Sequence, residues 1–245
     1  MNKQPVILVT GGARRVGAAI VRRLHAAGCA VAVHYRNSTS EAEALAQELN
    51  VARADSAAIF PGALENDATP DALIAAVLQR FGRLDGLVNN ASAFYPTPIG
   101  ATTAAQWDDL FAANARAPFF LTQAATPALR DAKGAIVNIV DIYAERPLAG
   151  HTVYSMAKAA LVMLTQALAK DLAPEVRVNA VAPGAILWPE SGKPEEAAEA
   201  LIAKTPLARK GEPADVAEAV RWLLMDAHYT TGQVIRVDGG RALSI

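Results

Sequence analysis

The sequence predicts an α/β fold, a doubly wound parallel sheet of about seven strands with helices on both faces. Short runs of β-branched and other apolar residues alternate along the chain with longer segments of helical periodicity. A glycine-rich turn lies between the first apolar run and the first helical segment. The chain has 245 residues, of which 52% are hydrophobic, and this suits one domain with a continuous core.

The first half of the chain contains four predicted strands and three predicted helices. The run VILV at Val6–Val9 is typical of a strand buried in a parallel sheet. Gly28 suits the end of the first helix, and Pro70 suits the first turn of the third. The predicted strands are Val6–Val9, Cys29–Tyr35, Ala57–Phe60 and Leu84–Asn89, and the predicted helices are Val16–Ala27, Ser40–Leu49 and Pro70–Phe81.

The second half continues the alternation around one irregular stretch. Pro189, Gly192 and Pro194 predict a loop over Ala185–Pro194. Because this loop follows the carboxyl end of a strand, we expect residues 185–204 to form a substrate loop within a single domain, residues 1–245. The predicted strands are Ala135–Val140, Val176–Val181 and Val234–Val237, and the predicted helices are Ala104–Leu129, Tyr154–Leu172, Glu195–Lys204 and Pro213–Met225.

Composition excludes several classes of protein. The formal net charge of −1 gives no electrostatic reason to expect nucleic acid or an anionic membrane as a partner. No apolar run approaches the roughly 20 residues of a membrane span, and the N-terminus does not resemble a secretory signal. The single cysteine, Cys29, excludes an internal disulfide, and we expect a cytoplasmic protein. His25 and His228 are expected at the surface, and no histidine pair has metal-ligand spacing, so no metal site is predicted.

The glycine-rich turn covers Thr10–Gly17, with the sequence TGGARRVG. Glycine here allows a tight turn and a close approach of backbone to a pyrophosphate, whose charge the N-terminus of the next helix favours. The turn therefore predicts a Rossmann-type dinucleotide site. The alternative is an ordinary glycine-rich turn between a strand and a helix, because such a turn alone is a weak signal.

Four further motifs follow this turn in order. They are Asn89–Ala91 (NNA) after the fourth predicted strand, Asn114 in the next helix, the pair Tyr154 and Lys158 (YxxxK), and Pro183-Gly184 after the sixth strand. With the turn, these motifs resemble the short-chain dehydrogenase/reductase family over essentially the whole chain. The resemblance implies an oxidoreductase that uses a nicotinamide coenzyme.

Three departures from the general pattern of that family are informative. Arg15 replaces the middle glycine of the turn, Ser92 replaces the glycine of NNAG, and Asp141 stands where the family has a catalytic serine. The stretch Asn89–Pro98 reads NNASAFYPTP. All four features resemble the pteridine reductases, a branch of the family.

The residues after the second predicted strand favour NADP(H). His34–Ser38 reads HYRNS, and the first acid after it is Glu41, so no carboxylate is expected to compete with a 2′-phosphate for Arg36. The alternative is that Arg36 is a solvated loop residue. Ala63-Leu64 replaces the Asp-Leu often found beside the adenine in this family. The residues predicted to bind the cofactor are Gly11, Arg15, Val16, His34, Tyr35, Arg36, Asn37, Ser38, Leu64, Asn90, Ala91, Ser92, Ile139, Tyr154, Lys158, Pro183 and Gly184.

The predicted catalytic residues are Asp141, Tyr154, Lys158 and Asn114. Tyr154 and Lys158 share one helix face, and we expect the ammonium to lower the pKa of the phenol and to hold the nicotinamide ribose. The resemblance implies that Asn114 supports Lys158 through a water. Ionised Asp141 cannot donate a hydrogen bond, so it suits a substrate with N–H donors or passes a proton through Tyr154. The alternative is an exposed loop aspartate.

An aromatic slot is predicted for a flat heterocyclic substrate. Phe94 suits one face of the slot and the nicotinamide the other, although a core phenylalanine is the alternative. His151 is expected on the substrate side of the helix that follows it. The residues predicted to bind the substrate are Arg15, Ser92, Phe94, Asp141, Tyr154, Leu187 and Trp188.

These observations lead to the hypothesis of an NADPH-dependent pteridine reductase. It would reduce dihydropterins, with oxidised pterins and dihydrofolate as further candidates, to tetrahydro forms by hydride transfer to a C=N bond. The alternatives are an NADPH-dependent carbonyl or alcohol oxidoreductase of the same family and a non-catalytic NADP(H)-binding protein. The resemblance also implies a homotetramer, with the helices over residues 107–129 and 154–172 between subunits and Arg241–Ile245 near a neighbour's site.

Overall fold

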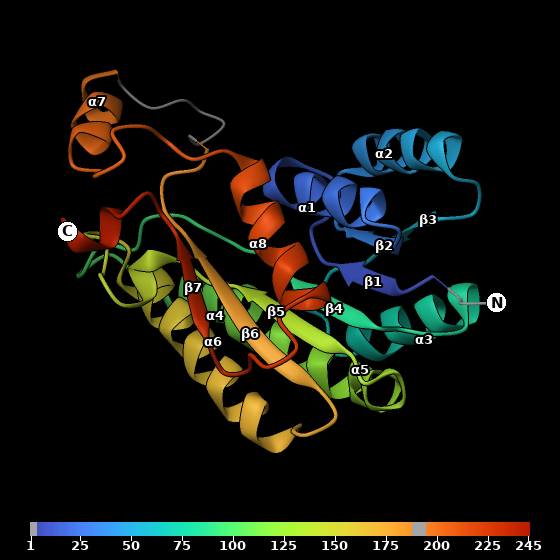
Figure 1. The fold of residues 1–245 in the computed structure, drawn as a ribbon. Coiled ribbons are helices and arrows are strands. Elements are labelled where there is room, and N and C mark those ends of the chain that lie inside the picture. The colour runs from blue at the N-terminus through green and yellow to red at the C-terminus, as the bar shows by residue number, and fades with distance from the viewer. Residues whose placement is uncertain (1–3, 188–194) are drawn as a thin grey trace.

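Seven parallel strands form the central sheet of the computed structural model, which describes residues 4–187 and 195–245 (Figure 1). The strands are β1 (Val6–Val9), β2 (Ala30–Tyr35), β3 (Ala57–Pro61), β4 (Gly86–Asn89), β5 (Ala135–Ile139), β6 (Arg177–Pro183) and β7 (Val234–Val237). Their order is β3-β2-β1-β4-β5-β6-β7, so the chain moves outward from β1 to β3 and then returns to the other side of β1. This order confirms the doubly wound α/β prediction and places the switch in direction between β1 and β4.

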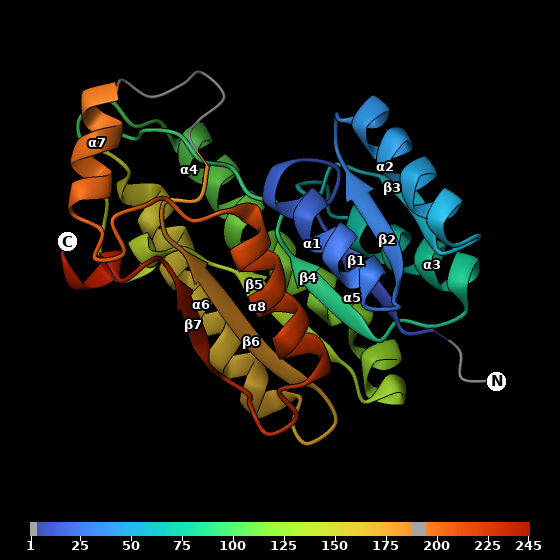
Figure 2. The same cartoon turned by 45° about the horizontal axis from the view of Figure 1, so that its top comes forward.

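Helices cover both faces of the sheet (Figure 1, Figure 2). One face is covered by α1 (Arg15–Ala26), α2 (Thr39–Ala52) and α8 (Pro213–Met225). The other is covered by α3 (Thr69–Phe81), α4 (Ala104–Phe111), α5 (Ala117–Ala132) and α6 (Thr152–Asp171). The short helix α7 (Glu195–Ala203) lies away from the sheet, beside the C-terminal segment.

Each face of the sheet has its own apolar core, because successive strand residues point to opposite faces. Ile7 and Val9 of β1 pack into the core under α1, α2 and α8, whereas Val6 and Leu8 pack into the core under α3 and α5. All four side chains are buried. Since both faces of the sheet are covered, its central strands are continuous apolar runs, and this is why the sequence pattern located them.

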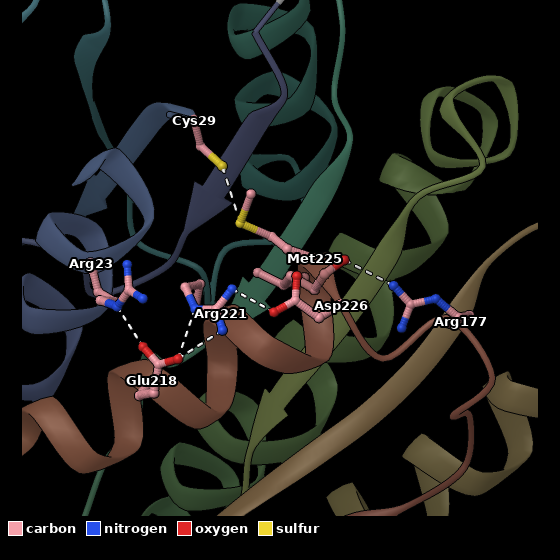
Figure 3. Close-up of polar contacts among 8 residues, drawn as sticks. Arg23, Cys29, Arg177, Glu218, Arg221, Met225 and Asp226 are labelled. Atoms are coloured by element: carbon pink, nitrogen blue, oxygen red, sulfur yellow. Dashed lines mark hydrogen bonds and ion pairs between the residues drawn. The ribbon is translucent and has the colours of Figure 1, made fainter. Parts of the chain in front are cut away.

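The C-terminal end of α8 is capped by an arginine from the sheet. Arg177, at the start of β6, donates hydrogen bonds of 2.7, 3.0 and 2.9 Å to the carbonyl oxygens of Leu223, Ala227 and Leu224. Figure 3 shows the Arg177 side chain directed at the end of α8. These are carbonyl groups at the end of a helix, where intrahelical partners are missing. The guanidinium therefore fixes the end of α8 to the edge of the core.

Ion pairs at the protein surface also run along α8 (Figure 3). Glu218 pairs with Arg23 of α1 and with Arg221, and Arg221 pairs with Asp226 at 2.7 Å. Surface pairs of this kind each contribute at most about 1 kcal/mol. The apolar packing between α1 and α8 is therefore the larger contribution to their attachment.

The helical region predicted over Ala104–Leu129 is divided in the structure. A π-helical turn, Ala112–Arg116, separates α4 from α5. Pro118 has no N–H to donate to the carbonyl group of Asn114 four residues earlier, so α-helical hydrogen bonding cannot continue through this point. The other predicted elements differ from the observed ones only by small offsets at their ends.

Two further expectations are corrected by the structure. His25 is buried rather than exposed, because the apolar face of α1 extends to its position, and its Nε2 lies 2.7 Å from Ser56 Oγ. The second expectation is that no segment approaches the length of a membrane span. Among the described residues, α6 is long and apolar enough by length and composition, with a mean hydropathy of 1.2 over its most apolar window. Its Leu161 packs against Ala180 and Ala182 of β6, which is the position of a core helix in an α/β domain.

Candidate active site

A cavity of about 650 Å³ opens at the carboxyl ends of β1, β2 and β4, beside the switch in the sheet. This is where open α/β sheets bind ligands. The predicted cofactor-binding residues that line it are Gly11, Arg15, Val16, His34, Tyr35, Arg36, Asn37, Ser38, Leu64, Asn90, Ala91 and Ser92. The others, Ile139, Tyr154, Lys158, Pro183 and Gly184, are outside its lining, at the ends of β5 and β6 and on α6.

Hydrogen bonds hold the glycine-rich turn against the segment after β4. Thr10 Oγ1 accepts from the backbone N–H groups of Asn90 at 2.9 Å and Ala91 at 3.0 Å. Asn90 Nδ2 donates to the carbonyl oxygens of Thr10 and Gly11. Gly11 has a φ of +59°, and a Cβ at Gly17 would collide with the Gly11 carbonyl group. The turn is therefore compact, open to the cavity and at the N-terminus of α1, which fits a pyrophosphate.

Arg15 occupies an unusual backbone conformation in this turn. Its φ is +53°, in the left-handed region that favours glycine, and its side chain is exposed at the cavity. A side chain in this region has a conformational cost of about 1 kcal/mol or more, and such residues cluster at functional sites. The strained position therefore supports a role for the Arg15 side chain.

His34, in β2, forms hydrogen bonds to both segments that flank it in the cavity wall. Its Nδ1 accepts a hydrogen bond from the N–H of Gly11, in the turn after β1, at 3.3 Å. Its Nε2 lies 3.0 Å from the carbonyl oxygen of Gly62, in the segment after β3. Because the carbonyl oxygen only accepts, the proton lies on Nε2. Burial lowers the pKa of His34 to about 4, so the ring is neutral at pH 7. With both nitrogens occupied, His34 shapes the cavity wall and has no ring nitrogen left for a ligand.

A carboxylate lies where none was expected. Arg36 Nη1 is 3.1 Å from Glu65 Oε1, and both residues line the cavity. The expectation that no acid competes for Arg36 is therefore wrong. It considered only the residues after β2, whereas parallel strands end at one edge of the sheet, and the segment after β3 brings Glu65 to the same place.

The predicted catalytic pair Tyr154 and Asp141 is in direct contact. Tyr154, on the first turns of α6, donates its hydroxyl to Asp141 Oδ2 at 2.7 Å. Asp141 follows β5, and its Oδ1 accepts from the N–H of Tyr143 at 2.9 Å, which fixes the carboxylate. Asp141 is largely enclosed but keeps part of its surface open, so it is not a solvated loop aspartate.

Burial determines the protonation of this pair. It raises the pKa of Asp141 above its usual range, and burial together with the Asp141 charge raises the pKa of Tyr154 well above its usual value. The expectation that Lys158 lowers the pKa of Tyr154 is therefore wrong. The Lys158 ammonium is 5.8 Å from the centroid of the tyrosine ring, and the nearer carboxylate and the loss of water prevail. Tyr154 keeps its proton at pH 7.

Lys158 and Asn114 occupy separate hydrogen-bond networks in the structure. Lys158 is buried, its Nζ donates to the carbonyl oxygen of Ile139 at 2.9 Å, and burial lowers its pKa to about 8. Asn114 Nδ2 donates to the Ala93 carbonyl oxygen at 2.9 Å, and Ser92 Oγ donates to Asn114 Oδ1 at 2.7 Å. Asn114 thus fixes the middle of the NNASAFYPTP stretch.

Phe94 is half exposed at the entrance to the catalytic pair, not in the core. Its ring stacks on His151 with centroids 4.8 Å apart and meets the ring of Tyr154 edge-on at 4.7 Å. His151 therefore covers one face of the Phe94 ring. The placement of His151 on the substrate side stays a prediction.

The predicted site residues that follow β6 lie outside the lining of the cavity, as far as the structure describes them. The Gly184 N–H donates to the carbonyl oxygen of Val237, and a Cβ at Gly184 would lie 2.7 Å from Asp238 Cβ, so Gly184 permits close packing with the C-terminal segment. Leu187 packs against the core under α8. Trp188 lies outside the described residues. Within residues 4–187 and 195–245, no group of three or more His, Cys, Asp or Glu side chains is arranged to hold a metal.

Comparison with known proteins identifies relatives along the whole chain. A family model described as Enoyl-(Acyl carrier protein) reductase matches residues 11–242. Pteridine reductase 1 of Leishmania tarentolae is 37% identical over 98% of this chain and 97% of its own. The 3-oxoacyl-acyl-carrier-protein reductase FabG of Staphylococcus aureus is also 37% identical, over 95% of this chain and 96% of its own. FabG of Staphylococcus epidermidis is 35% identical over 98% and 99% of the two chains.

Proposed function

This chain belongs to the short-chain dehydrogenase/reductase family of oxidoreductases, and within it we propose an NADPH-dependent pteridine reductase. The observation that favours this function is the hydrogen bond from Tyr154 to Asp141, at a position where carbonyl-reducing members have serine. A buried serine hydroxyl can donate to a carbonyl oxygen, whereas a carboxylate accepts from N–H groups and stores a proton. The proposal therefore rests on the chemistry of one side chain.

The coenzyme would bind in the 650 Å³ cavity. Gly11 and the start of α1 would receive the pyrophosphate, and Arg36, Asn37 and Ser38 would receive a 2′-phosphate. The buried ammonium of Lys158 would bind the hydroxyls of the nicotinamide ribose. When bound, a reduced nicotinamide supplies a hydride.

Two side chains would manage the proton in this reaction. As a C=N carbon of the pterin receives the hydride, Tyr154 donates its phenolic proton to the adjacent nitrogen, and the C=N bond becomes CH–NH. Asp141 would then take a proton from solvent and pass it to Tyr154 across the 2.7 Å hydrogen bond. Because burial raises the pKa of Asp141, its proton remains available at a higher pH than for an exposed aspartate. The rate is expected to fall as pH rises through that pKa.

The aromatic wall supports a flat substrate. Phe94, held by His151, would form one side of a slot for the pterin, and the nicotinamide would form the other. Arg15 and Ser92, which line the cavity, would contact substrate and coenzyme together. The similarity to Pteridine reductase 1 supports this assignment.

A second candidate is reduction of a 3-oxoacyl thioester. Its support is the FabG relative, which is as similar to this chain as Pteridine reductase 1 is. Asp141 opposes it, since a nearby carboxylate would destabilise the alkoxide that forms when a ketone accepts hydride.

A homotetramer in the cytoplasm is part of the proposal. Large apolar side chains on α4, α5 and α6 are exposed in the single chain, which is typical of surfaces that are covered in an assembly. They include Trp107, Phe119, Phe120 and Met163. Light scattering of the purified protein tests the assembly.

The function is tested by following NADPH oxidation with dihydrobiopterin and, in parallel, with an acetoacetyl thioester. We expect turnover of the dihydropterin and at least about a hundredfold lower kcat/KM for the thioester, which corresponds to about 2.7 kcal/mol of transition-state discrimination. Turnover of the thioester without turnover of dihydrobiopterin, oxidised biopterin or dihydrofolate would replace this proposal with the second candidate.

A further inference from the structure

We propose that Glu65 determines how strongly this enzyme distinguishes NADPH from NADH, because its carboxylate competes with the 2′-phosphate for Arg36. The inference rests on the proposed coenzyme site and deepens it. It assigns a specificity role to a residue that follows β3, away from the segment after β2 that favours NADP(H) in the sequence.

The geometry places the competitor at the phosphate-binding group itself. Glu65 Oε1 is 3.1 Å from Arg36 Nη1, and both side chains face the cavity that Asn37 and Ser38 also line. A guanidinium binds carboxylate and phosphate through the same N–H donors. While Glu65 occupies Arg36, a 2′-phosphate must displace it or accept a neighbouring negative charge.

The backbone around Glu65 keeps the carboxylate in this place. Arg116, in the π-helical turn, donates to the carbonyl oxygen of Glu65 at 3.2 Å and forms an ion pair with Asp67. The segment after β3 is thus attached to the π-helical turn that precedes α5. Glu65 consequently stays near Arg36 even when the exposed ion pair opens.

Because the Arg36–Glu65 ion pair is exposed, a phosphate group can replace Glu65 as the partner of Arg36. The Arg36 side chain is 57% exposed and the Glu65 side chain 44% exposed, so water and salt weaken their attraction. A phosphate with nearly two negative charges binds the guanidinium more strongly than one carboxylate does. NADPH therefore still binds, but competition from Glu65 reduces the affinity that its 2′-phosphate adds relative to NADH.

NADH meets a different situation. Its 2′-hydroxyl can donate to a carboxylate, which is the contact that acids make with the adenosine ribose in NAD-specific folds. Glu65 therefore leaves the affinity for NADH unchanged or raises it, and lowers the affinity for NADPH. The enzyme is expected to prefer NADPH by a smaller factor than the residues after β2 alone imply.

The test measures binding of both coenzymes to the full chain without any pterin. Calorimetric titration gives Kd for NADPH and NADH in wild type, Glu65→Gln and Arg36→Gln, with adenosine 2′,5′-bisphosphate against adenosine 5′-monophosphate as probes of the phosphate alone. Glu48→Gln is the matched control, because it removes the same charge from an exposed pair, Arg22–Glu48, outside the cavity lining.

We expect Glu65→Gln to raise the NADPH preference, Kd(NADH)/Kd(NADPH), about three- to tenfold through tighter NADPH binding. Arg36→Gln lowers the preference about tenfold or more, and Glu48→Gln leaves it within about twofold. A Glu65→Gln preference within twofold of wild type, or weaker NADPH binding in that variant, would overturn the inference. A wild type that prefers NADH would refute the proposed coenzyme while the shift in Glu65→Gln still tests Glu65, and an absence of pterin turnover would not affect this ratio.

Discussion

The two ends of the candidate active site use the same kinds of charged group in opposite ways. At the proposed adenosine end, Arg36 and Glu65 are exposed, so their ion pair can exchange with a ligand. At the catalytic end, Lys158, Tyr154 and Asp141 are largely removed from water, and the pKa of each is shifted by that burial. The difference shows that location, more than residue type, decides whether a charge selects a ligand or stores a proton.

The largest expected effect lies at the buried end. Tyr154→Phe removes the hydroxyl that contacts Asp141 and is expected to lower kcat about 10²- to 10⁴-fold, because the substrate nitrogen loses its proton donor. Steady-state kinetics with dihydrobiopterin measures this loss. The Kd of NADPH should remain within about threefold of wild type, and a variant that keeps more than a tenth of the wild-type kcat would show that Tyr154 is not the donor.

A smaller effect, on the free energy of unfolding rather than on kcat, is expected at His34 in the cavity wall. The folded-state pKa of about 4 lies below the ordinary value, so the unfolded chain binds the extra proton first as pH falls. The stability of the wild type should therefore decline between about pH 6.5 and pH 4, with a contribution from His34 of about 3 kcal/mol. Below the folded pKa this contribution stops changing.

The variant His34→Asn isolates that contribution. Asparagine can accept from the Gly11 N–H but does not titrate, so its free energy of unfolding should fall less steeply with acid than that of the wild type. Urea denaturation at pH 7 and pH 4.5 measures both slopes. Equal slopes in the two proteins would show that His34 is not held neutral by burial.

The smallest effect is expected at an exposed pair on the outer layer. Glu48 forms several close contacts with Arg22, and this pair lowers the pKa of Glu48, yet both side chains are half exposed. Glu48→Gln should lower Tm by no more than about 3 °C. Thermal melts at low and high salt check this, and a larger loss that persists at high salt would contradict the contrast between the two environments.

The sequence was sufficient for the sheet, for most helices and for the placement of Tyr154 and Lys158 on one helix, because each depends on local patterns. Buried strands are apolar runs, and Tyr154 and Lys158 are related by one helical turn. Glu65 was missed because its proximity to Arg36 depends on the pairing of β2 with β3. A search for acids after every strand that ends at the cavity would have found it.

Two other features depended on tertiary context. The assignment of His34 to cofactor binding placed it at the right cavity, but only its two hydrogen bonds show that the ring nitrogens are occupied. The pKa of Tyr154 follows from burial and from the distance to Asp141, neither of which the spacing of Tyr154 and Lys158 reveals. The break in the helix before Pro118, in contrast, was visible in the sequence as a proline.

The central claim is that Asp141 makes this site a pteridine reductase, and Asp141→Ser tests it most directly. This variant should lose at least about a hundredfold in kcat/KM for dihydrobiopterin, because Tyr154 loses its proton source and the pterin N–H groups lose their acceptor. Its kcat/KM for an acetoacetyl thioester should stay equal or rise. Full dihydrobiopterin turnover in Asp141→Ser, with Tyr154 intact, would contradict the account.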